Sequence, residues 1–276
     1  MIDVIEWTQD VSLDRPVLVV ALSGWVDAGS AGAMAAAHVE EALEDPVTFA
    51  RVDLSEIVDL QATRPTVELV DGVTRSIAWP EITFTAGHAG RDVVVVQGPE
   101  PSVRWKSFAA EVVQLATDVG AELAVTLGGM PAPASHRRPV RVLTTATTRA
   151  LAQESAPVRG DYEGPTGAQT VVQIAMGDAG LGGLGLWAQV PHYLAGTISP
   201  AAERALLSRL MELTGIDLDL SDLDARAAEY TRQVEQTIST RDDLAELVDR
   251  LEGALDELPT GDELVSEIEE FLRREG

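Results

Sequence analysis

Apolar residues along the chain form short continuous runs that alternate with longer segments of helical periodicity. The run Pro16–Leu22 contains no polar residue, which is typical of a strand buried on both faces of a sheet. The Ala-rich segment Ala31–Leu43 predicts a helix that ends before Pro46. Val47–Val52 predicts the next strand. This order of strand, loop, helix and strand indicates a parallel sheet.

A hairpin interrupts this rhythm between residues 66 and 86. The segments 67–70 and 73–78 flank Asp71-Gly72, a dipeptide that favours a two-residue turn between antiparallel strands. Ile82–Phe84 predicts a third short strand after the hairpin.

The alternation of strands and helices then returns. Strands are predicted at 92–97, 123–127, 140–145 and 184–190, and helices at 103–119, 166–176 and 200–214. The last of these helices begins at Pro200, which is a favoured first helical residue. The fold class expected is therefore α/β, with three layers and a mostly parallel central sheet.

The composition changes after Gly215. The segment 217–276 holds 19 acidic and 6 basic residues, a net charge of −13. Leucines and other apolar residues recur there at three- and four-residue steps, which predicts two or three amphipathic helices with narrow apolar stripes, the third over Leu264–Leu272. We expect an α/β domain at 1–215 and an acidic C-terminal extension at 216–276 that forms a helical hairpin.

The overall charge excludes several function classes. The chain of 276 residues carries a net charge of −25, which repels nucleic acid and anionic lipid. It has no cysteine, so thiolate nucleophiles and cysteine metal sites are excluded. Its apolar runs are far shorter than the roughly 20 residues that cross a bilayer, and no signal-peptide pattern opens the sequence. We therefore expect a cytoplasmic protein.

Loops at the carboxyl ends of strands are where ligands bind in a parallel sheet. The loop Ser23–Gly29 combines glycines, Trp25 and Asp27 before a helix. It predicts either a backbone-amide pocket for an anion or a tight turn in which Asp27 or Ser30 caps the helix. The loop Gln97–Pro101 is interpreted as mainly architectural because two prolines fix it.

Three further loops carry candidate chemistry. Leu127–Pro139 contains glycines followed by His136, Arg137 and Arg138, the densest basic cluster of the chain. This cluster predicts recognition of a carboxylate or phosphate; the alternatives are a loop that faces a protein partner, or arginines that pair with the chain's own acids. Tyr162–Gly167 could wrap a ligand, or Thr166 could cap a helix. The third loop holds His192, a candidate acid–base group or a structural residue. The candidate pocket residues are Gly24, Trp25, Asp27, Gly128, Gly129, His136, Arg137, Tyr162, Gly164, Thr166, Gly167, His192 and Tyr193.

Motifs that would name a reaction are missing from the sequence. It contains no G-x-x-x-x-G-K-[ST] phosphate loop, no G-x-G-x-x-G fingerprint after a strand, no H-E-x-x-H and no G-x-S-x-G. The single lysine, Lys106, lies within a predicted helix. We assign no catalytic residue and expect neither a cofactor nor a metal.

Read in order, these loops resemble the proteasome-assembly-chaperone family in its bacterial and archaeal branch. The matching segments are Gly24–Gly29, Gly98–Pro101 with Trp105, Leu127–Gly129 with His136–Pro139, Tyr162–Gly167 and Pro191–Tyr193. The resemblance implies an α/β fold similar to nucleoside phosphorylases, a helical C-terminal extension and oligomers, with a trimer among the stoichiometries. It also implies a chaperone-like role, since eukaryotic relatives template the proteasome α-ring, whereas some bacterial relatives are described as ATP-grasp-like.

Two functions are therefore compared. The first is a non-catalytic, homo-oligomeric interaction protein that binds a protein partner through its acidic extension and its loops. The alternative is a small-molecule binding protein or enzyme, for a nucleoside or phosphate, that uses the strand-end loops as one pocket. Convergence of those loops in space would favour the alternative.

Overall fold

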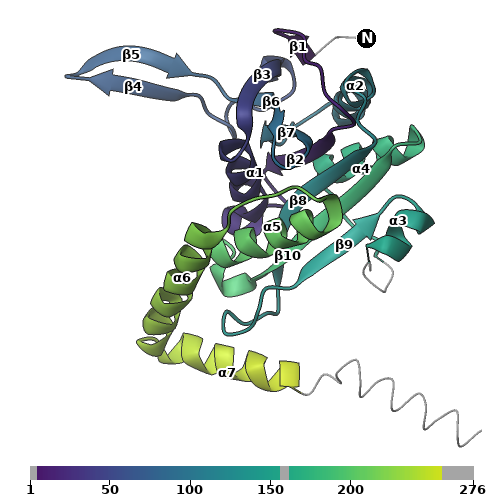
Figure 1. Ribbon diagram of the computed structural model, residues 1–276. Coiled ribbons are helices and arrows are strands. Elements are labelled where there is room, and N and C mark those ends of the chain that lie inside the picture. The colour runs from purple at the N-terminus through teal and green to yellow at the C-terminus, as the bar shows by residue number, and fades with distance from the viewer. Residues whose placement is uncertain (1–4, 156–161, 257–276) are drawn as a thin grey trace, which may run out of the picture.

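The computed structural model describes residues 5–155 and 162–256. An eight-stranded sheet in the order β1-β3-β6-β7-β2-β8-β10-β9 forms its centre (Figure 1). The strands are β1 (Ile5–Trp7), β2 (Val17–Ser23), β3 (Glu44–Asp53), β6 (Glu81–His88), β7 (Asp92–Pro99), β8 (Leu123–Ala132), β9 (Val142–Ala146) and β10 (Gly182–Pro191).

Helices cover both faces of this sheet. They are α1 (Ala31–Glu41), α2 (Trp105–Asp118), α3 (Arg149–Glu154), α4 (Ala168–Asp178), α5 (Pro200–Thr214), α6 (Ser221–Ser239) and α7 (Asp242–Asp256), with 3-10 turns η1 (Ala28–Ser30), η2 (Leu54–Glu56) and η3 (His192–Leu194). The expected α/β class is confirmed, and the predicted strands and helices of the α/β part are present. Residues 5–7 and 149–154 were not predicted, because segments this short carry no readable period.

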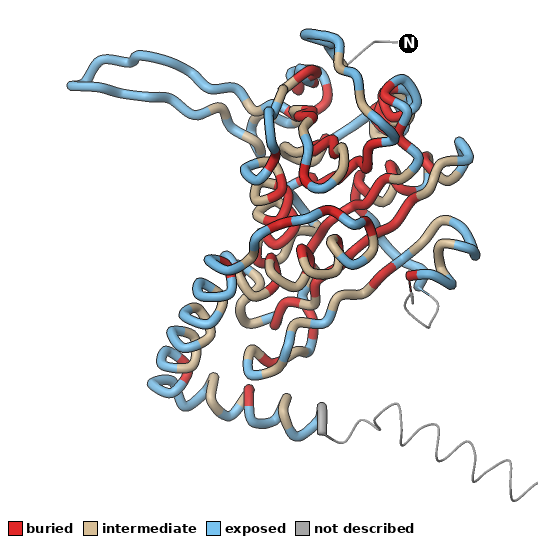
Figure 2. The backbone as a smooth tube through the Cα atoms, in the orientation of Figure 1, coloured by how far each residue is buried: buried red, intermediate tan, exposed pale blue. Residues whose placement is uncertain are grey.

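Alternation within β2 explains the three layers. Leu18 and Val20 face a core shared with α2 and α4, whereas Val17 and Val19 face a second core shared with α1 and α5. A strand that feeds two cores must be apolar at every position, which is why its sequence shows no alternation. Buried positions therefore run along the central strands and the inner sides of the helices (Figure 2).

The parallel prediction holds only for the central strands. β7, β2, β8 and β10 pair in parallel, but β1, β3 and β6 pair antiparallel at one side, and β9 pairs antiparallel with β10 at the other. The sheet is therefore mixed. β2 and β3 flank one helix in the sequence, as a parallel unit would require, yet β7 and β6 lie between them.

The predicted hairpin is present as a separate two-stranded sheet of β4 (Thr66–Val70) and β5 (Val73–Ala78). Its turn residues Asp71 and Gly72 have φ values of 52° and 74°, as a tight turn between antiparallel strands requires. The hairpin extends away from the body (Figure 1). Ile82–Phe84 is part of β6 and belongs to the main sheet.

The C-terminal segment starts inside the core and then leaves it. Ile216, Leu218 and Leu223 are buried in the core shared with α1 and α5. Glu203 of α5, buried to 1% exposure, lies 3.2 Å from His38 of α1 and 3.6 Å from Arg226 of α6. α7 then turns away from α6 instead of folding back along it, so the two helices do not form the expected hairpin (Figure 1). The division at 215/216 stays a prediction, and the third helix predicted over Leu264–Leu272 lies outside the described residues.

Candidate functional site

The loop after β2 places a carboxylate at the start of α1. Asp27 Oδ1 accepts hydrogen bonds from the backbone N–H groups of Gly32 at 2.7 Å and Ala33 at 3.4 Å. Burial raises the pKa of Asp27 to about 6, although both hydrogen bonds oppose the shift. Ser30 makes no capping hydrogen bond with its side chain. Of the two predicted caps, Asp27 is the one that serves the helix.

A second carboxylate fills the start of α4. Glu100, directly after β7, accepts from the backbone N–H of Ala168 at 2.6 Å and from that of Trp25 at 3.4 Å. A Cβ atom on Gly24 or Gly167 would lie 2.9 Å or 2.8 Å from atoms of Glu100, so a side chain at either position would require Glu100 to shift. Sequence reasoning missed Glu100. The signal in the sequence was an acidic residue between Pro99 and Pro101, shortly after a predicted strand.

Glycines after β8 let two strand-end loops touch. A Cβ on Gly129 would lie 2.1 Å from the carbonyl oxygen of Ala28, and one on Gly128 would lie 2.7 Å from that of Val26. Gly129 also forms an isolated parallel bridge with Asp27. The close approach of main chains accounts for these glycines without a ligand.

The predicted pocket residues thus form two neighbouring groups and one exposed turn. Gly24, Trp25, Asp27, Gly128, Gly129 and Gly167 lie around the ends of β2, β7 and β8. The backbone N–H of Gly29 donates to the carbonyl of Ala195 at 2.8 Å and links this region to the chain after η3. Tyr162, Gly164 and Thr166 lie on an exposed turn before α4, where the Tyr162 hydroxyl donates to the carbonyl of Pro165 at 2.8 Å.

The basic cluster forms the second group, and the acidic extension holds it. The His136 side chain, 3% exposed, lies with Nε2 2.7 Å from Glu235 of α6 and with Nδ1 2.8 Å from the Tyr193 hydroxyl. Arg137 bonds the same Glu235 at 2.9 Å and Asp249 of α7 at 3.0 Å. We call this set the loop–helix clamp.

Electrostatics within the clamp are strong. Hydrogen bonds from Arg137 and then from His136 hold the pKa of Glu235 down to about 2. Hydrogen bonds to Glu235 and Asp249 raise the pKa of Arg137 above its usual value, so the guanidinium stays charged. Arg138 adds an ion pair of 3.0 Å with Glu252 of α7. Of the two interpretations of the basic cluster, pairing with the chain's own acids is the one observed. His192 is exposed and its ring meets that of Tyr193 edge-on.

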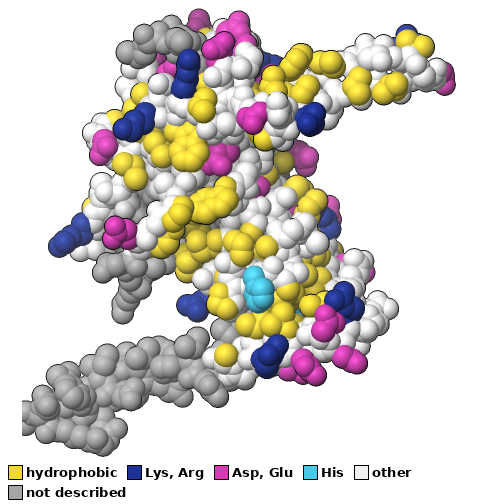
Figure 3. All heavy atoms as spheres, turned by 180° about the vertical axis from the view of Figure 1, so that it is seen from behind, with side chains coloured by type: hydrophobic (Ala, Val, Ile, Leu, Met, Phe, Trp, Pro, Cys, Tyr) yellow, Lys and Arg dark blue, Asp and Glu magenta, His cyan; other side chains and the backbone are white. Residues whose placement is uncertain are grey.

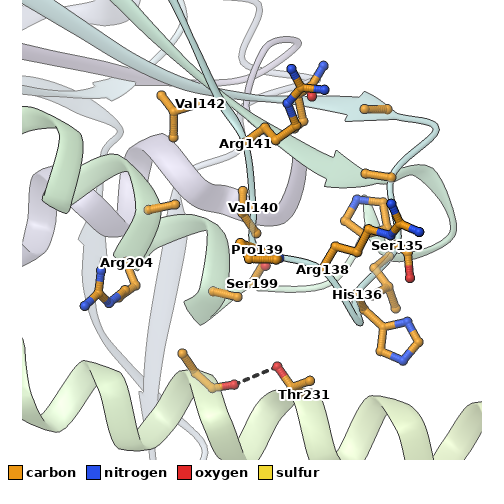
Figure 4. A pocket seen from close by; sticks show the side chains of 18 of the residues that line it. Ser135, His136, Arg138, Pro139, Val140, Arg141, Val142, Ser199, Arg204 and Thr231 are labelled. Atoms are coloured by element: carbon orange, nitrogen blue, oxygen red, sulfur yellow. Dashed lines mark hydrogen bonds between the residues drawn. The ribbon is translucent and has the colours of Figure 1, made fainter. Parts of the chain in front are cut away.

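A groove of about 1100 Å³ runs beside the clamp, between the loop 132–142, α5 and α6. His136 and Arg137 are the predicted residues that line it, together with Arg141 and Arg204, which sequence reasoning did not select. In Figure 4 Thr231 of α6 lies across the groove from Pro139 and Val140. Arg204 is paired with Asp224 at 2.6 Å.

Among residues 5–155 and 162–256, no three His, Asp or Glu side chains gather closely enough to hold a metal ion. No helix in the same ranges combines the length and the hydropathy needed to cross a bilayer.

Comparison with known proteins identifies the family. Residues 21–238 match the model of the PAC2 family. A PAC2 family protein from Streptomyces avermitilis is 38% identical, covering 84% of this chain and 99% of that chain with a TM-score of 0.78. A proteasome-assembly chaperone homologue from Mycobacterium tuberculosis is 35% identical over 84% of this chain and 99% of its own, with a TM-score of 0.77.

A third structure extends further along the chain. A protein of unknown function from Mycobacterium tuberculosis is 29% identical, covers 91% of this chain and 90% of its own, and has a TM-score of 0.84. No curated protein matches by sequence. The family model spans most of the chain, and the resemblance to proteasome-assembly-chaperone proteins is confirmed: this chain belongs to the PAC2 family.

Proposed function

We propose that this chain is a non-catalytic, assembly-chaperone-like protein that acts in the cytoplasm as a homo-oligomer and binds a protein partner. The first support is its family, since a relative 35% identical over 84% of this chain is a proteasome-assembly chaperone homologue. The observation that carries the proposal comes from the strand ends, where an enzyme of this architecture would hold its ligand.

Both helix starts at those strand ends are already occupied by the chain's own carboxylates. Asp27 accepts a hydrogen bond from the backbone N–H of Gly32 at the start of α1, and Glu100 accepts one from the backbone N–H of Ala168 at the start of α4. A helix N-terminus attracts one anion through its free N–H groups and its dipole. A phosphate would have to displace a carboxylate at either position and would meet its negative charge. This arrangement favours a structural role for the strand-end loops.

The partner surface we propose is the outer side of the acidic extension. The clamp fixes the inner side of α6 and α7 through Glu235 and Asp249. Asp242, Asp243 and Glu246 at the start of α7 are exposed. Exposed acids of this kind fit a basic protein surface and speed its encounter, and Asp243 also pairs with Arg241 at 2.8 Å.

An assembly assay tests this function. Proteasome α and β subunits from the source organism are mixed with the full chain, and the rate of ring formation is followed by native gel electrophoresis. We expect faster or more complete assembly with the wild-type chain. Replacement of Asp242, Asp243 and Glu246 by lysine should remove the effect, whereas the same change at the exposed acids Asp10, Glu41 and Asp118 should not.

Two results would contradict the proposal. One is an assembly rate that the chain does not alter. The other is thermal stabilisation of the chain by phosphate, nucleosides or nucleotides, because that would show an open ligand site and favour the small-molecule alternative.

A further inference from the structure

The β4–β5 hairpin, residues 66–78, is an arm whose surface is uncovered within the described part of the chain. All five residues of β4 and all six of β5 are exposed. Val67, Leu69 and Ile77 are 51%, 60% and 53% exposed, and the strand register places all three on one face. Figure 3 shows hydrophobic side chains along the arm. A two-stranded hairpin is marginally stable alone in water, so this arm would gain from being covered.

The end of the arm is acidic. Asp71 lies in its turn and makes no ion pair within residues 5–155 and 162–256, and Glu68 accepts a hydrogen bond only from Ser76 at 2.9 Å among those residues. Val70 and Val73 face each other beside the turn. The tip therefore presents Asp71 next to apolar side chains, with Glu68 and the exposed Arg75 further back along the arm.

The groove beside the clamp has the complementary surface. Its walls include Val140, Val142 and Leu194, and Arg141 lies among them. Arg141 is exposed and, in the part of the chain that the structure describes, has no ion pair. The groove follows the start of β9, the last strand of the sheet. Among residues 5–155 and 162–256, β9 pairs only with β10, which leaves its other edge open to an added strand.

The arm cannot reach this groove in its own molecule. It connects β3 to β6, and the strands β7, β2, β8 and β10 separate β6 from β9. Five steps between strands amount to roughly 24 Å, and the arm points away from the body (Figure 1). An arm that enters the groove must therefore come from another copy.

We propose that the arm of one copy docks in the groove of a second copy, with Asp71 facing Arg141 and Val70 and Val73 against the apolar wall. This inference rests on the homo-oligomer of the proposed function and names its interface. Each copy carries one arm and one groove, so two copies can exchange arms reciprocally, or a head-to-tail series can close into a ring. The acidic chain would thus associate through an arginine that has no ion pair among the described residues.

Charge reversal tests the contact in the full chain. Native mass spectrometry and light scattering should show an oligomer for the wild type. Asp71→Arg alone and Arg141→Asp alone should each weaken association by about tenfold or more, because each places like charges opposite each other. In an equimolar mixture the arm of each variant is attracted by the groove of the other, so mixed assemblies, pairs at least, should form again. Asp10→Arg and Lys106→Asp, which lie in neither surface, should leave the mass unchanged.

The outcomes separate this inference from the proposed function. A monomeric wild type, or single variants with the wild-type mass, would overturn the docking. So would two weakened variants that fail to associate when mixed. The assembly assay with proteasome subunits is read independently, so its failure leaves the docking result intact. A Val70→Ser variant that folds, by circular dichroism, and still forms the wild-type oligomer would also count against the arm.

Discussion

Ionisation of Asp27 should destabilise the folded protein, and replacing Asp27 with asparagine should therefore stabilise it at neutral pH. Burial raises the pKa of this carboxyl from 3.8 to about 6. The folded state then holds the proton more tightly than the unfolded state. The proton bound to Asp27 therefore stabilises the folded state fully below pH 3.8, and this stabilisation is lost as the pH rises through about 6.

The size of the effect follows from the shift. About two pKa units correspond to about 3 kcal/mol at pH 7 and above. The Asp27→Asn variant keeps a carbonyl oxygen to accept from the amide of Gly32, 2.7 Å away in the wild type, so the cap itself is preserved. We expect the variant to be more stable by about 3 kcal/mol at pH 8 and to lose most of the gain at pH 4.

Urea unfolding at a series of pH values between 4 and 8 measures this directly, with the midpoint followed by circular dichroism. Asp53 is the matched control. It is exposed and accepts from the amide of Ser55 at 2.9 Å, and its pKa is lowered by that bond. Asp53→Asn should thus slightly destabilise the protein at pH 8, the opposite sign. An Asp27→Asn variant that is no more stable than the wild type at pH 8 would refute the reasoning.

Three further substitutions have expected outcomes. Glu235→Gln weakens the loop–helix clamp and should increase amide exchange in α6, at a cost in stability of about 1 kcal/mol. The effect should be smaller at pH 2, where the wild-type Glu235 carboxylate begins to gain its own proton. Unchanged exchange would contradict the clamp. Glu100→Gln offers Ala168 a weaker acceptor and should lower the free energy of unfolding by about 1–2 kcal/mol, measured in urea. Gly129→Ala should prevent soluble expression because its Cβ would lie 2.1 Å from a carbonyl oxygen, whereas Gly196→Ala, which meets nothing within 4 Å, should express normally.

Local signals predicted the elements well where one physical rule dominated. Pro200 and a stripe of leucines predicted α5 with the bounds that it has. Asp71-Gly72 predicted the hairpin, and both residues adopt the positive φ that such a turn needs. In each case the deciding energy lies within a few neighbouring residues, so the sequence window contains it.

Strand order and side-chain pairing depend on distant residues, and there the sequence was insufficient. Nothing in 44–53 says that β3 pairs with β1 and β6 instead of β2. The basic run at 136–138 and the acids of 235–252 were both visible in the sequence, but their pairing spans about a hundred residues. The glycines of the strand-end loops were selected as ligand-binding residues, although the packing of Ala28 against Gly129 is enough to require one of them.

These pairings bear on where function can lie in this molecule. Asp27 and Glu100 bind the backbone N–H groups at the starts of α1 and α4, where an anion would otherwise bind beside a parallel sheet. The features that remain uncovered lie at the two sides of the sheet, the apolar arm between β3 and β6 and the groove along β9. A small-molecule enzyme concentrates polar groups in one concave site at the strand ends, whereas a protein that joins other proteins needs exposed apolar and charged surface at its periphery. The distribution seen here favours the proposed protein-binding role, and it makes the arm and the acidic extension the first places to look for loss of function.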